Sequence, residues 1–328
     1  VGTCPCALSL ATPAAMLASA GALARRGILT RRLQAIEALA AVDTVVFDKT
    51  GTLTRDAFVL RRVALRPGVT REQVLAGAAA LARRSLPCDL DVPYGDAPRE
   101  RLDAFAAKGK GAPLVVFVHG GYWKALDKSV HSFIAAALHD AGAAVVVPNY
   151  TLAPQASIPQ ITLQVARAVG WSWRHARTLN ADPRRISVIG HSAGGQLAAM
   201  MLACAWKVFD PELPADVVKR AMGLSGLYDL APLMHTPSLQ EALRLTPQQV
   251  HDASPARLPA PARGRFVAVV GGEESGEYLR QNRLIQQAWG RERVPLAAAL
   301  PGLNHFSIVD ALVTRGTRVN RLARELMR

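Results

Sequence analysis

The sequence predicts an α/β fold in which a mostly parallel sheet is flanked by helices, and three apolar segments carry the prediction. The β-branched run at 185–189 leads through a short glycine-containing turn into an Ala/Leu-rich helical run at 196–203. Two further apolar runs, at 114–118 and 266–270, are typical of buried strands. A glycine pair follows the second run directly, and another follows the first run after one intervening residue. Polar groups that follow such strands gather at the carboxyl edge of an open parallel sheet, so we expect a site there.

The turn after the first of these strands reads Gly-His-Ser-Ala-Gly at 190–194. A strand that ends in a sharp turn before a helix lifts a serine hydroxyl out of the sheet, and flanking glycines tolerate the close backbone approach. A glycine-punctuated loop with a surface serine is the alternative for this pentapeptide alone. We interpret Ser192 as a nucleophile because other catalytic features accompany it.

The first accompanying feature is His-Gly-Gly-Tyr-Trp at 119–123, directly after an expected strand. Gly120 and Gly121 would let the backbone approach a substrate. The N–H groups of Gly121 or Tyr122, together with that of Ala193, are expected to donate to the oxyanion of a tetrahedral intermediate. The histidine of this loop precedes the serine, so we interpret it as structural.

An acid and a histidine then follow in the chain order of hydrolases. Gly-Gly-Glu-Glu-Ser comes after the strand expected at 266–270, and either Glu273 or Glu274 could orient an imidazole. Beyond a last strand expected at 295–300, His305 is the only histidine after the acid and is the predicted general base. A surface-loop histidine is the alternative, which three features in the required order disfavour.

These positions predict hydrolysis through an acyl-enzyme, with a small-molecule substrate and no metal or organic cofactor. His305 would take the Ser192 proton as Oγ attacks a carbonyl carbon, and would then protonate the leaving group. Water would repeat the cycle on the acyl-enzyme.

Segments on both sides of these motifs carry a family resemblance. They read Leu-Asp-Val-Pro-Tyr-Gly at 90–95, His-Gly-Gly-Tyr-Trp at 119–123, Asn-Tyr-Thr-Leu-Ala-Pro at 149–154, the serine turn at 190–194, Ser-Gly-Leu-Tyr-Asp-Leu at 225–230, Gly-Glu-Glu-Ser at 272–275 and Asn-His-Phe at 304–306. Together they resemble the kynurenine formamidase branch of the α/β-hydrolases, a neighbour of the hormone-sensitive-lipase-like esterases. The resemblance implies the α/β-hydrolase fold and cleavage of an N-formyl aryl amide such as N-formylkynurenine, a step of tryptophan catabolism. A carboxylesterase for short acyl esters is the close alternative.

The resemblance also assigns individual residues. Glu274 matches the triad acid of the family, usually an aspartate, and Glu273 would then be its solvated neighbour. Trp123 stands where related esterases usually carry another glycine. We expect Tyr122, Trp123 and Tyr228 to be the aromatic residues nearest a planar substrate.

The beginning of the chain carries two different motifs. Cys-Pro-Cys at 4–6 opens an apolar stretch, and Asp-Lys-Thr-Gly-Thr begins at Asp48. Together they resemble a heavy-metal-transporting (copper) P-type ATPase, in which the two cysteines ligate a soft metal and the aspartate is phosphorylated by ATP. Thiolates such as those of Cys4 and Cys6 suit Cu(I) and Zn.

We therefore predict two units: a P-type ATPase-like remnant over 1–84, with a partial membrane helix and the phosphorylation motif, and a hydrolase domain over 85–328. They would have been joined by gene fusion, rearrangement or assembly error. We expect no pumping, because the further spans and domains that a pump needs are not encoded here. The alternative to an enzyme is that the chain acts as a metal-binding or membrane fragment of a pump that does not itself pump. This alternative depends on Cys4, Cys6 and Asp48.

Charge and composition narrow the partners. The net charge is +14, and half of this excess lies in residues 1–84. The arginines are scattered without aromatic interleaving or a binding motif, so we expect no nucleic-acid partner. At most a weak attraction to anionic lipid is expected, near the arginines at 25, 26, 31 and 32.

The first 24 residues carry no charge, but their Ala/Gly/Thr-rich composition with Pro5 and Pro13 makes a poor membrane span. Membrane association through residues 1–26 is therefore expected to be weak or absent. No positive charge precedes the apolar stretch as it does in a signal peptide, and the four cysteines lack disulfide-framework spacing. We expect a cytoplasmic protein, with a homodimer as the oligomer to test.

Overall fold

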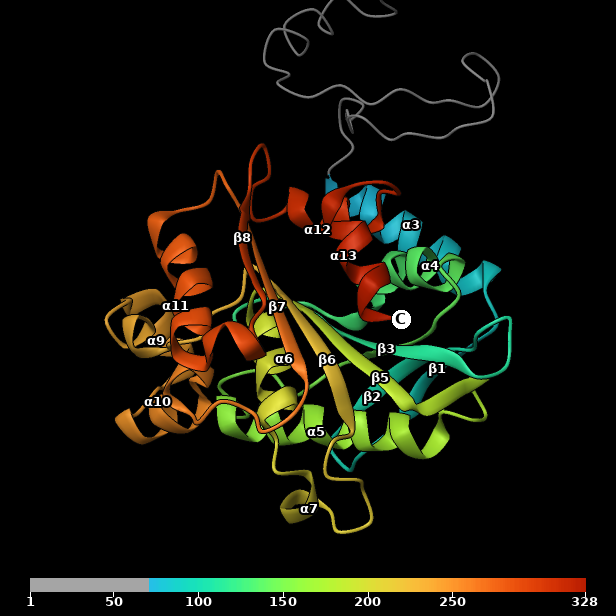
Figure 1. The fold of residues 1–328 in the computed structure, drawn as a ribbon, viewed down its shortest axis with the longest axis horizontal. Helices are drawn as coiled ribbons and strands as arrows, with labels where there is room; N and C mark the ends of the chain where they lie inside the picture. Colours follow the sequence, from blue (N-terminus) through green and yellow to red (C-terminus); the bar gives the residue numbers. More distant parts are fainter. Residues whose placement is uncertain (1–70) are drawn as a thin grey trace, which may run out of the picture. The chain divides into compact units, whose positions relative to one another are not determined.

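A single eight-stranded sheet runs through residues 71–328, which are the residues that the computed structural model describes (Figure 1). The strand order is β1-β2-β4-β3-β5-β6-β7-β8. β2 runs antiparallel to both β1 and β4, and all neighbours from β4 to β8 are parallel. The strands are β1 (Cys88–Pro93), β2 (Arg101–Phe105), β3 (Ala112–Val118), β4 (Ala144–Pro148), β5 (Ala181–His191), β6 (Val218–Leu224), β7 (Arg265–Gly271) and β8 (Leu296–Leu300).

Helices fill the connections between the parallel strands from β3 onward, as a parallel sheet requires. The helical segments are α3 (Arg71–Ser85), η1 (Lys128–His131), α4 (Ser132–Asp140), α5 (Ile158–His175), α6 (Ala193–Ala203), α7 (Trp206–Phe209), α8 (Ala231–Met234), α9 (Pro237–Leu243), α10 (Pro247–Ala253), η2 (Pro255–Arg257), α11 (Gly276–Arg293), α12 (Ser307–Val313) and α13 (Arg318–Leu326). α5 begins with a capping box in which Ser157 and Gln160 satisfy each other's backbone N–H groups.

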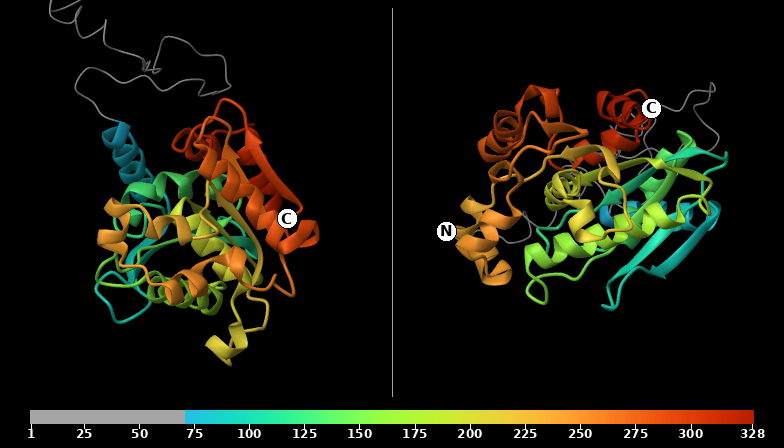
Figure 2. Two further views of the ribbon diagram at one scale, coloured as in Figure 1. Left: turned by 90° about the vertical axis from the view of Figure 1, so that its left-hand side faces the viewer. Right: turned by 60° about the horizontal axis from the view of Figure 1, so that its bottom comes forward.

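The central strands are apolar on both sides because helices cover both faces of the sheet. One core cluster joins the sheet to α5, α6 and α11, and a second joins it to α3, α4, α12 and α13. Figure 2 shows the sheet between its helices from two further directions. The strands expected at 114–118, 185–189 and 266–270 lie within β3, β5 and β7, and the helix expected at 196–203 lies within α6.

Helix α3 crosses the boundary that the sequence predicts at residue 84. By contacts within the chain, one compact unit begins at Leu75. Ala79 of α3 is fully buried in the second core cluster, and Leu75 packs against it. Arg83 lies 3.3 Å from the fully buried carboxylate of Asp103 on β2. The last residues of the predicted remnant therefore pack as part of the α/β unit.

The ion pairs around Asp103 anchor this part of the structure. The Lys128 ammonium lies 2.7 Å from Asp103 and 2.5 Å from Asp91, and the lysine is almost fully buried. Two cations and a backbone N–H, that of Asp91, thus surround one buried carboxylate. Such pairing is what makes a buried charge tolerable.

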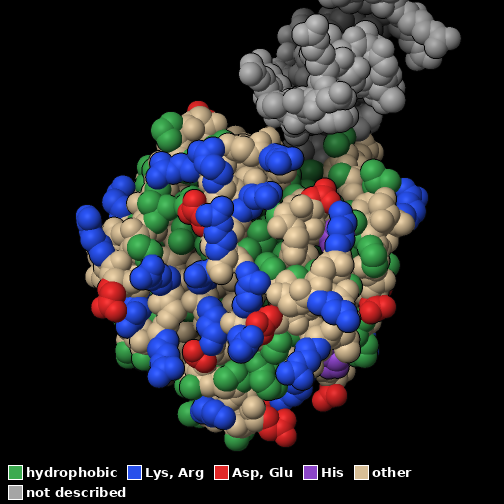
Figure 3. Space-filling model, turned by 45° about the vertical axis from the view of Figure 1, so that its right-hand side comes forward, with side chains coloured by type: hydrophobic (Ala, Val, Ile, Leu, Met, Phe, Trp, Pro, Cys, Tyr) green, Lys and Arg blue, Asp and Glu red, His purple; other side chains and the backbone are tan. Residues whose placement is uncertain are grey.

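Lys and Arg side chains are spread across the face drawn in Figure 3, with fewer Asp and Glu side chains between them. Within residues 71–328 no helix is both long enough and apolar enough to cross a membrane. Cys4, Cys6, Asp48 and the apolar stretch at 1–26 lie outside the described residues.

Candidate active site

Ser192 lies on a strained turn between β5 and α6. Its backbone has φ 56° and ψ −118°, a conformation that costs a serine on the order of 1–3 kcal/mol. A Cβ on Gly190 would lie 1.9 Å from the carbonyl oxygen of Gly194, and a Cβ on Gly194 would lie 2.0 Å from that of Val118. Only glycine fits at either position, so the sequence pattern enforces the turn.

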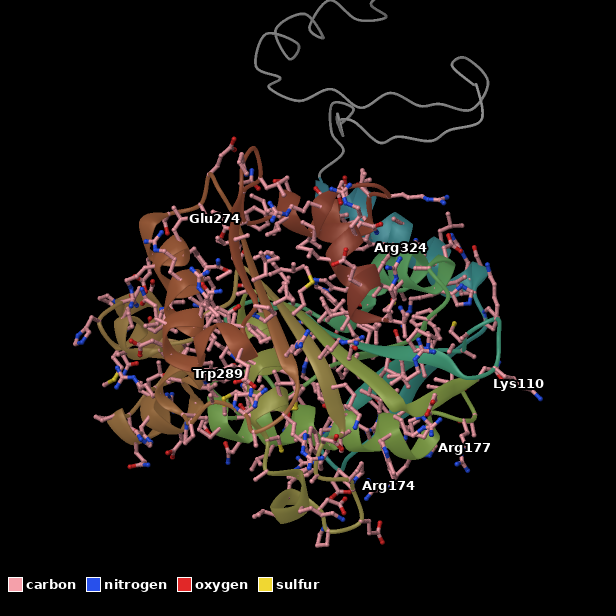
Figure 4. The ribbon with its side chains drawn as sticks, in the orientation of Figure 1. Lys110, Arg174, Arg177, Glu274, Trp289 and Arg324 are labelled. Atoms are coloured by element: carbon pink, nitrogen blue, oxygen red, sulfur yellow. The ribbon has the colours of Figure 1, made fainter. Side chains whose placement is uncertain are left out.

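His305 and Glu274 meet at the carboxyl edge of the sheet, where the loops after β7 and β8 lie next to each other. The His305 Nδ1 atom lies 2.7 Å from the Glu274 carboxylate, whose side chain is 2% exposed. Figure 4 shows Glu274 beyond the end of β7. Its other oxygen accepts hydrogen bonds from the Gly271 N–H at 2.8 Å and from the Ser225 hydroxyl at 2.5 Å. Glu273 is exposed, and the structure does not bring it to the histidine.

The imidazole of His305 is held from several sides. His191, the residue before Ser192, bonds through Nε2 to the His305 carbonyl oxygen at 2.8 Å. The two imidazole rings lie 4.7 Å apart. With Nδ1 on the carboxylate, Nε2 is the ring nitrogen left to exchange a proton.

The 119–123 loop lies directly against the serine turn. A Cβ on Gly120 would lie 2.9 Å from the His191 carbonyl oxygen and 3.0 Å from the Ser192 Cβ. Gly121 and the two residues after it all have positive φ. Among residues 71–328, no protein acceptor receives the N–H of Gly121, Tyr122 or Ala193. Unpaired backbone N–H groups beside a nucleophile are the donors that an oxyanion needs.

His119, which opens this loop, is fully buried. Its Nδ1 lies 2.8 Å from the Gly120 carbonyl oxygen, and its ring stacks on Tyr150 at 4.5 Å. Burial lowers the pKa of His119 to about 3, so the ring is neutral at ordinary pH. These contacts agree with the structural role expected from its place in the chain.

Two of the three aromatic residues expected near a planar substrate are buried in the main core cluster. Trp123 and Tyr228 have no exposed surface. The Trp123 indole N–H donates to Gln196 of α6 at 3.1 Å, because the loop reverses through three consecutive positive φ angles and returns the chain to the core. Tyr228 packs edge-on against Phe266 of β7.

Tyr122 remains at the site and has a partner that the sequence did not reveal. Its hydroxyl lies 2.8 Å from the hydroxyl of Tyr278, which belongs to the first turn of α11. The Tyr278 ring lies 4.5 Å from the His305 ring, and the Ser192 side chain is among the polar groups that act on the pKa of its phenol. In the sequence, the one feature that could have pointed to Tyr278 was its position four residues after Glu274. The tertiary structure shows why this position matters, because the first turn of α11 lies beside His305.

Metal-ligating residues are not grouped at this site. Within the part of the chain that the structure describes, no cluster of three or more His, Cys, Asp and Glu side chains could hold a metal ion. Cys88 and Cys204 are the two described cysteines, and both are free thiols.

Comparison with known proteins adds a family to this geometry. The family model BD-FAE matches residues 102–241. Kynurenine formamidase of Danio rerio is 31% identical over 243 residues, which cover 71% of this chain and 80% of the relative. The chain belongs to the kynurenine formamidase family. It is therefore a hydrolase.

Solved structures agree with the fold of this family member. A protein of Silicibacter sp. TM1040, described as a candidate thioesterase, is 31% identical with a TM-score of 0.67, over 77% of this chain and 91% of that one. A thermostable carboxylesterase from a metagenomic library is 18% identical with a TM-score of 0.61, over 80% of this chain and all of that one. At that identity the carboxylesterase shows the α/β-hydrolase fold alone.

A shorter stretch of the chain has relatives of another kind. Over 82 residues, 25% of this chain, it is 50% identical to the copper-exporting P-type ATPase of Mycobacterium tuberculosis. Those residues cover 11% of the ATPase. The likeness thus extends to a fragment of a pump.

Proposed function

We propose that the protein is a serine hydrolase that removes the formyl group from an N-formyl aryl amide such as N-formylkynurenine. The observation that carries the proposal is the 2.7 Å contact of His305 with the buried Glu274 beside the strained Ser192 turn. A nucleophile, a base and an acid that orients the base are the elements of acyl transfer through a covalent intermediate. The name of the Danio rerio relative supports the formamide as substrate.

The proposed reaction begins when Ser192 Oγ attacks the formyl carbon and His305 Nε2 takes its proton. The oxyanion is held by the N–H groups of Gly121 or Tyr122 and of Ala193, and loss of one such donor typically costs about 3 kcal/mol of transition-state stabilisation. His305 returns the proton to the amide nitrogen, which leaves as an arylamine. Water then hydrolyses the formyl ester of Ser192 by the same steps and releases formate.

Glu274 acts through His305 in this scheme. Its carboxylate keeps the proton on Nδ1, which leaves Nε2 free to accept, and it stabilises the imidazolium that forms. Within residues 71–328, the hydrogen bonds of His305 are the one from its Nδ1 to Glu274 and the one that its carbonyl oxygen makes with His191, and neither involves the Ser192 hydroxyl. Catalytic hydrogen bonds of this kind often close only when substrate binds.

A carboxylesterase for short acyl esters is the second candidate, favoured by the esterases among the solved structures that share the fold. The same groups would serve either reaction, so the leaving group and the acyl group distinguish them. Rates on N-formylkynurenine and on a short nitrophenyl ester, measured side by side, test the proposal. Hydrolysis of the ester with no turnover of N-formylkynurenine would favour the esterase.

We further propose that the reaction needs no cofactor, takes place in the cytoplasm and is carried out by a monomer or homodimer. The oligomeric state is measured by light scattering as the protein elutes from a size-exclusion column. Activity that persists after chelation and dialysis supports a reaction without a cofactor.

A further inference from the structure

Tyr278 lies where the reacting acyl group would have to be placed. Its ring lies 4.5 Å from the His305 imidazole, and the Ser192 side chain is among the polar groups that act on the pKa of its phenol. Ser192 is only 2% exposed. An acyl carbon that approaches Oγ must therefore fit beside the Tyr278 phenol or displace it.

The phenol is held in place from the opposite side of the site. The Tyr122 hydroxyl lies 2.8 Å from it and belongs to the loop after β3, whereas Tyr278 belongs to α11 after β7. The two side chains thus join the glycine loop to the helix that follows the acid. Both rings also pack against the main core cluster, which limits how far they can move.

Burial and the neighbouring phenol raise the pKa of Tyr278, so the hydroxyl stays protonated at neutral pH. It can donate or accept a hydrogen bond, but it is not a base at that pH. What it contributes beside Ser192 and His305 is the volume of its ring and a hydroxyl held by Tyr122.

We propose that Tyr278, held by Tyr122, is a specificity-determining residue that restricts the acyl group transferred to Ser192 to formyl and the shortest alkanoyl groups. A formyl carbon carries only hydrogen beside its oxygen and leaving group, so it needs the least room beside the phenol. Each added methylene has to occupy space that the phenol takes. The inference rests on the proposed function and names the acyl class that this site accepts.

The experiment compares p-nitrophenyl formate, acetate and butyrate as substrates of the full chain. Tyr278→Ala removes the ring, Tyr278→Phe removes only the hydroxyl, and Tyr122→Phe removes the bond that holds it. Leu163→Ala, an exposed position on α5, is the matched control for a truncation that does not touch the site. Melting temperature and labelling of Ser192 by a methyl phosphonate report that each variant is folded with a reactive serine.

For Tyr278→Ala we expect the ratio of kcat/KM for butyrate to that for formate to rise at least about tenfold, because about tenfold is the low end of what one methylene is worth in an apolar pocket and butyryl is three carbons longer than formyl. Tyr278→Phe and Tyr122→Phe each remove the bond between the two phenols but keep the Tyr278 ring, so both should keep the preference of the wild type within about threefold. Leu163→Ala should keep the wild-type ratio.

An unchanged ratio in a folded, phosphonate-reactive Tyr278→Ala protein would overturn the inference while leaving the serine hydrolase intact. If that variant does not fold, Tyr278→Leu, which keeps apolar volume near the core, gives the same comparison at an intermediate size. A wild-type chain whose Ser192 neither turns over any of the esters nor reacts with the phosphonate would contradict the proposed function instead.

Discussion

At the scale of single residues, the geometry of the site depends on a few positions where a larger side chain would not fit or a hydrogen bond would be lost. Ser192 is held at a positive φ by glycines on which even a methyl group would collide with backbone. Glu274 is fixed by two hydrogen bonds besides the one to His305. Such rigid support is what keeps catalytic groups within a few tenths of an ångström of a productive arrangement.

Ser192→Ala tests the nucleophile. The change removes one oxygen at a position where alanine can replace serine without new contacts, so the melting temperature should stay close to that of the wild type. Turnover should fall by on the order of 10⁵–10⁶-fold, as when a catalytic serine is removed elsewhere, and labelling by an organophosphonate should disappear. Labelling that persists in the variant would show that another residue is the nucleophile.

Glu274→Gln and Glu273→Gln form a matched pair of neighbouring substitutions. Only Glu274 contacts His305. The amide of Glu274→Gln should therefore favour the wrong tautomer of the His305 imidazole and lower kcat by on the order of 10⁴-fold. Glu273 is exposed, and its amide should leave kcat close to the wild-type value. Similar losses in both variants, or the reverse order, would contradict the assignment of the acid.

His119 makes the stability of the fold depend on pH. Its pKa is about 3 in the folded chain, where Tyr150 and His131 stack on it, and about 6.5 when unfolded. Because the folded value is lower, the unfolded state binds the proton first, and stability is lost as the pH falls from 6.5 toward 3, at up to about 1.4 kcal/mol per pH unit.

Urea unfolding of the wild type and of His119→Gln at pH 7 and pH 5 measures this contribution. The wild type should lose about 2 kcal/mol more than the variant between the two values. The titratable and charged groups that act on the ring, His131, Asp127 and Arg99, are the same in both proteins. Equal losses would mean that the buried histidine does not set the acid sensitivity.

At the scale of elements, α3 is the segment whose assignment changes most between sequence and structure. Ala79 and Leu75 pack on the core beneath α4, α12 and α13, and Arg83 approaches the buried Asp103. A junction predicted at residue 84 would cut between this helix and the strand that follows it. We propose that the helix serves the hydrolase as a structural element, whatever its origin.

Shortened chains that begin at Arg71 and at Ser85 test this role. Every proposed catalytic residue lies beyond both positions, so we expect hydrolysis from both. The chain from Ser85 loses the buried face of α3 and the Arg83 guanidinium, which should lower its stability by about 2 kcal/mol and its melting temperature by about 4–8 °C. Equal melting temperatures would show that α3 adds nothing, and a folded but inactive chain from Ser85 would show that it shapes the site.

At the scale of the whole molecule, the chain combines a hydrolase with a stretch similar to a fragment of a copper-exporting ATPase. We expect no ATP-dependent acyl phosphate at Asp48, because the stretch that resembles the pump covers only 11% of the copper-exporting relative. Incubation with labelled ATP followed by acid quenching measures this directly.

The same preparation separates the two function classes. Hydrolysis should survive a chelator and the double substitution Cys4→Ser, Cys6→Ser, and it should vanish with Ser192→Ala. Activity that requires added copper or zinc and is lost with the cysteines would favour the metal-binding fragment instead.

The central strands of the sheet, the serine turn and the chain order of Ser192, Glu274 and His305, the proposed catalytic residues, can all be read from the sequence. Those features are local: β-branched runs set the strands, and glycines mark the two places where backbone must approach backbone. The residues alone left Glu273 and Glu274 both open as the acid, and the family resemblance favoured Glu274. The structure distinguishes them, because only the Glu274 side chain turns inward toward His305. Other features arise only in the folded chain: the burial of Trp123 and Tyr228, the approach of Tyr278 to His305 and the packing of α3 on the second core cluster. Each depends on contacts between segments far apart in the chain, and a sequence pattern does not contain the direction in which a side chain leaves a loop.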